Sequence, residues 1–110
     1  MTVKLDQDHK TVMVYRNGQW GYVCNDQWTD AEAETVCRGL NYTNGVSAQR
    51  SSGSPMSPFL LHNVSCGSEA GALNQCHFDD VDSDVCRYLE PAAVLCYNEG
   101  DCEYLSLIHI

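Results

Sequence analysis

Seven cysteines in 110 residues constrain this chain more than any other feature of its sequence. A chain of this length forms one domain with a modest hydrophobic core, so covalent crosslinks matter for its stability. No C-x-x-C pair occurs, which argues against a structural zinc site and against a thiol redox centre. Disulfide bonds are therefore the natural interpretation, and they indicate an oxidising, extracellular compartment. The alternative is a cytosolic protein whose free cysteines are buried as small apolar residues.

The charge balance narrows the class of partner. The formal net charge is −9, and the six basic residues are scattered along the chain. Nucleic-acid binding needs clustered lysine and arginine to neutralise phosphates, so no nucleic-acid partner is expected. An acidic surface suits cations or basic partners, although solubility alone is a sufficient reason for such a charge.

Two observations bear on membranes and secretion. No apolar run is long enough to span a bilayer, so this segment is not expected to insert into a membrane directly. The stretch from Met1 to Lys10 is polar and lacks the apolar core of a signal peptide. We therefore expect a piece of a longer, multidomain extracellular precursor, in which Met1 is internal or was added for expression.

Three segments favour β-strands. Residues 11–24 predict a hairpin, because Asn17-Gly18 lies between two β-prone runs and both of these residues tolerate a positive φ. Short strands are also expected over Phe59–Val64 and Ala92–Tyr97, where apolar and β-branched residues gather.

One segment predicts the principal helix, Asp30–Leu40. Thr29 can cap its start, with Glu32 three residues on as the partner in a capping box. The apolar spacing turns Cys37 towards the core, and Asn41 can take the left-handed conformation that ends a helix. Strands around one principal helix indicate the α+β class.

The remaining segments lack a clear period. Residues 43–58 are rich in Ser, Gly, Asn and Pro and predict a surface loop. Ala70–Leu73 is expected to form a single helical turn, and Asp79–Asp84 an acidic loop. The tail Leu105–Ile110 resembles the translation of a sequencing adapter, in which case it is not native. An ordinary frayed apolar terminus is the alternative.

Several motifs in a fixed order resemble those of the scavenger receptor cysteine-rich (SRCR) domain family. They are Gly18–Trp28 for G-x-W-G-T-V-C-D-D-x-W, Val36–Tyr42 for V-C-R-Q-L-G-Y, Pro58–Cys66 for P-I-W-L-D-D-V-x-C, Leu73 to Cys76 for L-x-x-C, and Cys86–Cys96 for C-x-H-x-E-D-A-G-V-x-C. The motifs extend over most of the chain, and several in the right order are far more specific than one.

The resemblance implies a small disulfide-stapled α+β domain, in which a curved antiparallel sheet cradles one principal helix. The domain would cover residues 1–98 and be followed by a tail over residues 99–110. The family pairing implies the disulfides Cys24–Cys86, Cys37–Cys96 and Cys66–Cys76. Tyr42 stands where the eight-cysteine type has a further cysteine, so the chain resembles the six-cysteine type. Cys102 then has no partner among these six cysteines. It could belong to a following segment, pair with a cysteine of another chain, or be an artefact near the tail.

The resemblance also implies a divalent-cation site at Asn25, Asp26 and Glu90. All three side chains offer oxygen ligands for Ca²⁺ or Mg²⁺, and the amide of Asn25 in place of a carboxylate predicts weak binding. The alternative is that Asp26 caps a turn and Glu90 pairs with an arginine. The aspartates of residues 79–84 are a rival cation site, but they lack the later residues of an EF-hand and better fit a solvated loop.

Some positions depart from the family pattern. His62-Asn63 replace an aspartate pair, Tyr88 replaces a histidine, and Pro91 and Ala93 replace an aspartate and a glycine. These departures fall in the motifs that carry polar residues, so they change the expected ligand site more than the expected fold.

Two tripeptides are N-glycosylation acceptors if the chain is secreted. They begin at Asn41 and Asn63. A glycan on Asn63 would compete for the surface next to the replaced aspartate pair.

The resemblance implies an extracellular ligand-binding module of a scavenger-receptor-like or secreted multidomain protein. Its expected ligands are proteins, polyanions or microbial surfaces, bound through a cation. The alternatives are an accessory domain of an extracellular enzyme, such as a protease or an amine oxidase, and a structural spacer in a repeated array. No G-x-S-x-G or similar nucleophile motif occurs, so the chain is not expected to be an enzyme.

Overall fold

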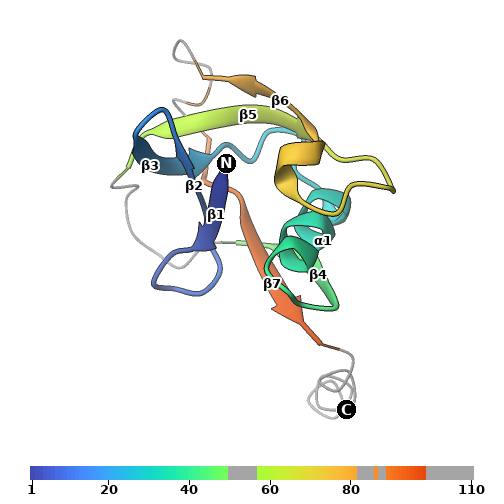
Figure 1. Cartoon of the computed structure of the whole chain (residues 1–110). Coiled ribbons are helices and arrows are strands. Elements are labelled where there is room, and N and C mark those ends of the chain that lie inside the picture. Colours follow the sequence, from blue (N-terminus) through green and yellow to red (C-terminus); the bar gives the residue numbers. More distant parts are fainter. Residues whose placement is uncertain (50–56, 82–85, 87–88, 99–110) are drawn as a thin grey trace.

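The computed structural model describes residues 1–49, 57–81, 86 and 89–98. Its elements, in chain order, are β1 (Thr2–Leu5), β2 (Val12–Arg16), β3 (Gln19–Val23), α1 (Asp30–Gly39), β4 (Asn44–Ala48), β5 (Phe59–Ser65), the 3-10 turn η1 (Leu73–Gln75), β6 (His77–Asp80) and β7 (Ala93–Tyr97). Figure 1 shows α1 beside β4 and β7, while β5 runs beside β3.

The strands form two sheets. The larger has the order β1-β2-β3-β5-β6, and the smaller pairs β4 with β7. The α+β class is confirmed, but the larger sheet is mixed, because β3 and β5 pair in parallel while its other pairs are antiparallel. Parallel neighbours need a long crossover connection, and the segment that contains α1 and β4 supplies it.

The predicted hairpin is confirmed as β2 and β3. Asn17 and Gly18 have φ values of 55° and 83°. The tight two-residue turn of a hairpin requires such positive φ values at both central residues. β2 and β3 pair across it from Arg16 opposite Gln19 onward. Alternate β2 residues Val12 and Val14 are fully buried in the core.

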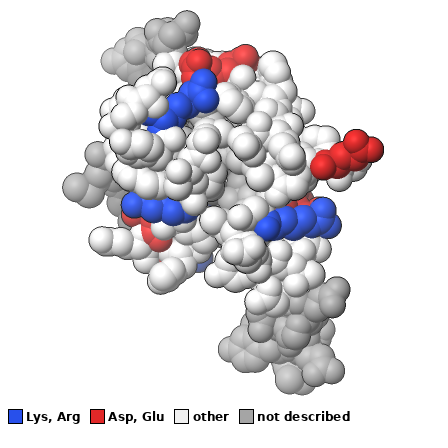
Figure 2. All heavy atoms as spheres, viewed as in Figure 1, with Lys and Arg blue, Asp and Glu red and all other residues white. Residues whose placement is uncertain are grey.

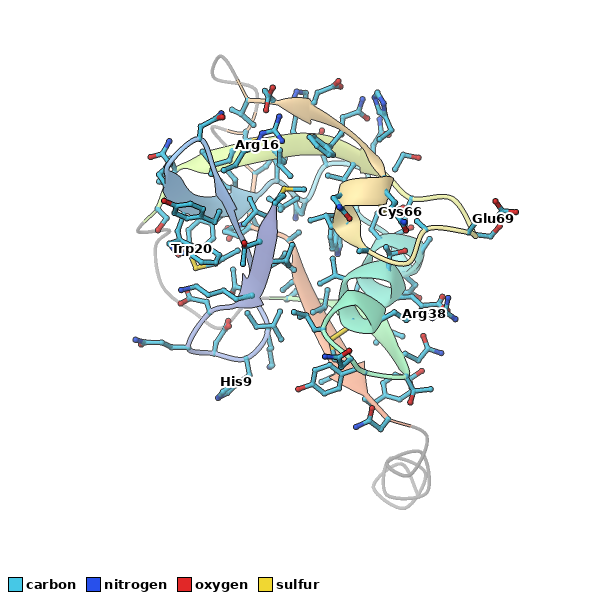
Figure 3. All side chains as sticks on the ribbon, in the orientation of Figure 1. His9, Arg16, Trp20, Arg38, Cys66 and Glu69 are labelled. Atoms are coloured by element: carbon cyan, nitrogen blue, oxygen red, sulfur yellow. A yellow bond between two sulfur atoms is a disulfide. The ribbon has the colours of Figure 1, made fainter. Side chains whose placement is uncertain are left out.

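The helix begins as the sequence predicts. Thr29 and Glu32 form the capping box, and the Thr29 backbone N–H donates to Glu32 Oε1 over 2.8 Å. Glu32 is buried and does more than cap, because its Oε2 accepts from the Cys66 backbone N–H at 3.1 Å. Figure 3 shows Cys66 next to the first turn of α1. Asn41, with φ 73°, follows the end of the helix.

Three disulfides close the core between the helix and the sheets. Cys37 on α1 is joined to Cys96 on β7, Cys24 at the end of β3 to Cys86, and Cys66 to Cys76. Cys37 is fully buried, as its helical spacing predicts. The apolar core around these bonds includes Val12, Val14, Val23, Ala33, Val36, Leu61, Val64, Leu73, Ala92 and Val94.

The loop predicted over residues 43–58 is wrong in its first part. Residues 44–48 form β4, which pairs antiparallel with β7. The segment has low strand propensity, but Gly45 lets β4 approach Cys37 closely, and tertiary packing overrides local preference. Residues 50–56 lie outside the described part of the chain.

Smaller boundaries also differ from the prediction. The helical turn expected over Ala70–Leu73 lies later, at η1, and the acidic loop expected from Asp79 begins inside β6. β1 was not predicted. Its four residues are at most half-buried, and they pair along one edge of β2.

Some predictions fall outside the described residues. They concern Asp82, Asp84, Tyr88, Cys102 and the tail from residue 99. Among the residues that the structure describes, no helix is long and apolar enough to cross a membrane.

Candidate functional site

The end of β3 and the approach to β7 bring Asn25 and Glu90 together. Cys24 and Pro91 form an antiparallel bridge, and the Asn25 backbone N–H donates to the Glu90 carbonyl oxygen at 3.0 Å. Both residues are exposed. Two of the three predicted cation ligands therefore come from adjacent backbone segments that are far apart in the sequence.

The carboxylate of Asp26, the third predicted ligand, is turned towards β5. Both of its oxygens lie 3.1 Å from the Asn63 backbone nitrogen, which donates to them. Asp26 Oδ2 also lies 3.4 Å from His62 Nδ1. The Asp26 side chain retains 25% of its exposure, so one side of the carboxylate still reaches solvent.

A bulge in β5 creates this contact. The pairing of β5 with β6 shifts register between His62 and Ser65, and Asn63 has φ 53°. A bulge takes a backbone N–H out of the regular ladder and redirects side chains. The freed N–H of Asn63 is the one that meets Asp26.

The same bulge links Asp26 to a second carboxylate. Asn63 Nδ2 donates to Asp79 Oδ2 over 2.9 Å, and Asp79 Oδ1 lies 3.6 Å from His77 Nε2. His62 and Asn63 thus stand between two aspartates, in the place of the family's aspartate pair. The sequence revealed their positions in the motif but not these contacts, because the bulge leaves no local signal.

The described half of the rival acidic segment is already engaged. Asp79 binds Asn63, and Asp80 Oδ1 accepts from Arg16 Nε at 2.9 Å. Engaged carboxylates have fewer lone pairs left for a cation, and this holds for Asp79 and Asp80 as it does for Asp26, which accepts from the Asn63 N–H.

The predicted cation ligands Asn25, Asp26 and Glu90 suit a hard cation such as Ca²⁺ better than a transition metal, because their side chains offer only oxygen. Among the described residues, the one group of three His, Cys, Asp or Glu side chains with ligand atoms within 4.8 Å of one another is Cys24, Asp26 and Cys86. Cys24 and Cys86 are joined in a disulfide, so they offer no thiolate. The side-chain oxygens of Asn25, Asp26 and Glu90 remain, and oxygen is the ligand type that Ca²⁺ and Mg²⁺ accept.

The described Lys and Arg side chains on the face shown in Figure 2 are separate blue patches and do not form a continuous basic surface. Arg16 pairs with Asp80, and Arg38 pairs with Glu34 one turn earlier on the helix. This face therefore lacks the clustered positive charge that phosphate backbones require.

The two glycosylation acceptors differ in their surroundings. Asn41 is exposed just after α1, and Tyr42 and Thr43 of its tripeptide are exposed too. Asn63 is half-buried and its side-chain amide donates to Asp79. Modification of either asparagine stays a prediction.

Comparison with known proteins agrees with the fold of the chain. The model of the family described as "Scavenger receptor cysteine-rich domain" matches residues 6–97. A crystal structure of the dimeric form of the SRCR domain of mouse MARCO is 31% identical, with a TM-score of 0.66 over 78% of this chain and 83% of that one. The third SRCR domain of murine neurotrypsin is 32% identical, with a TM-score of 0.66 over 86% of this chain and 94% of that one.

Proposed function

The chain belongs to the scavenger receptor cysteine-rich family, and we propose that it is an extracellular module that binds protein or polyanionic ligands, including microbial surfaces. SRCR domains are extracellular, non-catalytic interaction modules. The disulfide-closed core supports this assignment, because a reducing compartment would not preserve it.

We further propose that a divalent cation, Ca²⁺ or Mg²⁺, mediates binding. The observation that carries this proposal is the hydrogen bond from the Asn25 N–H to the Glu90 carbonyl, which brings Glu90 to the segment that also carries Asp26, whose side chain is 25% exposed. A cation held by these oxygens on an open surface keeps coordination positions for an anionic group of the ligand.

A second candidate function is that of an accessory domain in an extracellular enzyme. The neurotrypsin domain is by its name the third of its kind in its parent protein, so a domain of this fold can be one module among several. The full-length transcript of this chain would separate an enzyme's accessory domain from a receptor ectodomain.

The cation proposal is tested by calcium titration, followed by calorimetry and NMR chemical shifts. We expect a dissociation constant of about 10⁻⁴–10⁻³ M, the range of extracellular modules. Asn25→Asp should tighten binding by about tenfold, because it adds a negative charge close to a divalent cation in a solvated site. Glu90→Ala should abolish binding.

Glu69→Ala is the matched control, since it removes an equal charge from an exposed position. In Figure 3 Glu69 points away from the body of the domain. It should leave the affinity unchanged. Binding that survives Glu90→Ala but disappears when the aspartates at positions 79, 80, 82 and 84 are replaced would move the site to the rival segment. If calcium binds to none of the variants, the cation proposal is wrong.

A further inference from the structure

Two of the three disulfides are enclosed by the core. Cys24 and Cys86 are 0% and 2% exposed. Cys37 is fully buried, and a Cβ added at Gly45 would lie too close to its sulfur, so the backbone of β4 covers that atom. Cys96 meets Cys37 between β7 and the helix. A reductant in solution therefore reaches either of these bonds only after the fold has opened.

The third disulfide, Cys66–Cys76, lies outside this core, at one end of the pairing between β5 and β6. β5 ends at Ser65 and β6 begins at His77, so the bond joins the two residues directly beyond this last pair. Cys66 is half-buried and lies beside α1 in Figure 3, and the two residues that follow it are exposed. Together with one side of α1, these three residues line a hollow of about 390 Å³.

The hollow provides what thiol–disulfide exchange requires, which is a path for an incoming thiolate to one sulfur of the bond. That path leads to Cys66, because Cys76 is only 8% exposed and does not line the hollow. Cys76 is suited to be the leaving group. The Ala72 carbonyl oxygen lies 3.7 Å from Cys76 Sγ, so it can accept a hydrogen bond from the thiol that Cys76 becomes.

We propose that Cys66–Cys76 is a thiol–disulfide exchange site, and that its reduction by a dithiol loosens this end of β5 and β6 while the rest of the domain stays folded. The first thiolate of the dithiol attacks Cys66 Sγ and forms a mixed disulfide, and Cys76 leaves as a thiolate that takes up a proton. The second thiol then attacks the mixed disulfide and releases Cys66. The dithiol gives up two electrons and becomes a disulfide, while both cysteines become thiols.

Reduction would release the loop of residues 67–75, which carries η1. Two backbone bonds report on this release, because they belong to the cysteines themselves. The Cys66 N–H donates to Glu32 Oε2 at 3.1 Å, and the Cys76 N–H donates to the Leu73 carbonyl oxygen at 3.0 Å. The other two disulfides would still tie the first hairpin and α1 to the C-terminal strand.

The test is partial reduction of the native domain. Free thiols are first blocked with N-ethylmaleimide, limiting dithiothreitol is then added, and newly formed thiols are trapped with iodoacetamide and located by peptide mapping. We expect Cys66–Cys76 to be reduced at least about tenfold faster than either other bond, because exchange at an enclosed bond must wait for the fold to open. Amide hydrogen exchange should show lost protection at Cys66 and Cys76.

Two variants test the route of access. Ala31 is exposed and lines the hollow, so Ala31→Trp should fill it and slow the reduction of Cys66–Cys76 several-fold. Gln7→Trp is the matched control, because Gln7 is also exposed but does not line the hollow, and it should leave the rate unchanged.

The double variant Cys66→Ala with Cys76→Ala represents the opened state without a reductant. It should keep the amide protection of Val12, whose N–H donates to the Ala92 carbonyl oxygen at 3.0 Å, and lose protection around residues 66–76. Equal or faster reduction of another disulfide would overturn the proposal. So would an unchanged rate in Ala31→Trp, or general loss of amide protection when Cys66–Cys76 alone is reduced.

Discussion

Gly45 illustrates how one residue can fix the distance between two elements. A Cβ added there would lie 2.8 Å from Cys37 Cβ, 3.2 Å from the Leu95 carbonyl oxygen, and too close to Cys37 Sγ. The neighbours cannot move easily, because Cys37 is tied to Cys96 by a disulfide. The absence of a side chain at Gly45 therefore lets β4 pack directly on α1.

This packing gives a prediction for Gly45→Ala. The variant should lower the free energy of unfolding by about 1–3 kcal/mol, the usual cost of overpacking a core. Urea unfolding monitored by tryptophan fluorescence would measure it. Gly67→Ala is the control, since an added Cβ there meets nothing within 4 Å. Equal effects of the two substitutions would contradict the role given to Gly45.

The conformations of some residues could be predicted from the sequence, while the contacts of others could not. The turn at Asn17-Gly18 and the helix end at Asn41 were predictable, because the left-handed conformation is a local preference of these residue types. The contacts of Asp26 with His62 and Asn63 were not, since they depend on a bulge in a distant strand. Resemblance to the family indicated which positions matter, but not how the replaced aspartates would be compensated.

Elements with strong local signals were predicted, and elements made by distant pairing were missed. The hairpin and α1 carry turn, cap and period signals within a few residues. β4 was missed because its Asn-Gly-Val-Ser-Ala sequence favours a turn, and only β7 and the helix hold it extended. The parallel pairing of β3 with β5 was likewise invisible, since a strand's own pattern does not reveal its neighbour's direction.

The disulfides differ in the length of chain that each one closes, which gives a prediction at the scale of elements. Cys37–Cys96 spans 59 positions and Cys66–Cys76 spans 10. The Cys24–Cys86 bond remains in both variants and shortens the loop that Cys37–Cys96 closes to roughly 23 residues. Replacing both cysteines of the Cys37–Cys96 bond with alanine should therefore cost about 0.7 kcal/mol more than replacing both of the Cys66–Cys76 bond, from loop entropy alone. The burial of Cys37 acts in the same direction.

Urea midpoints of the two double variants would measure the difference. The 37/96 variant should unfold at the lower urea concentration. If the 66/76 variant is the less stable of the two, the short loop contributes through native contacts, and the bond from Cys66 N–H to Glu32 becomes the first to examine.

For the whole molecule, we predict that residues 1–98 fold without the rest of the chain. The family match ends at residue 97, and β7, the last described strand, ends at Tyr97. The cut should follow Asn98, because Asn98 Oδ1 accepts from the Thr43 N–H at 3.1 Å. Deletion of residues 99–110 should leave the melting temperature unchanged within error in a calorimetric scan. A clear loss would mean that the tail packs on the domain, since each buried Leu or Ile contributes about 1.5–3 kcal/mol.

The Cys24–Cys86 disulfide also determines how the domain would carry mechanical tension. Between Cys24 and Cys96 the chain has roughly 70 residues, with a fully extended contour of about 250 Å. Under load, however, the shortest covalent path runs through the Cys24–Cys86 bond and then along roughly 10 residues to Cys96, about 35 Å when stretched. Even with its sheets pulled apart, this stretch would behave as a short, nearly inextensible link, and slack could come only from the segments before Cys24 and after Cys96.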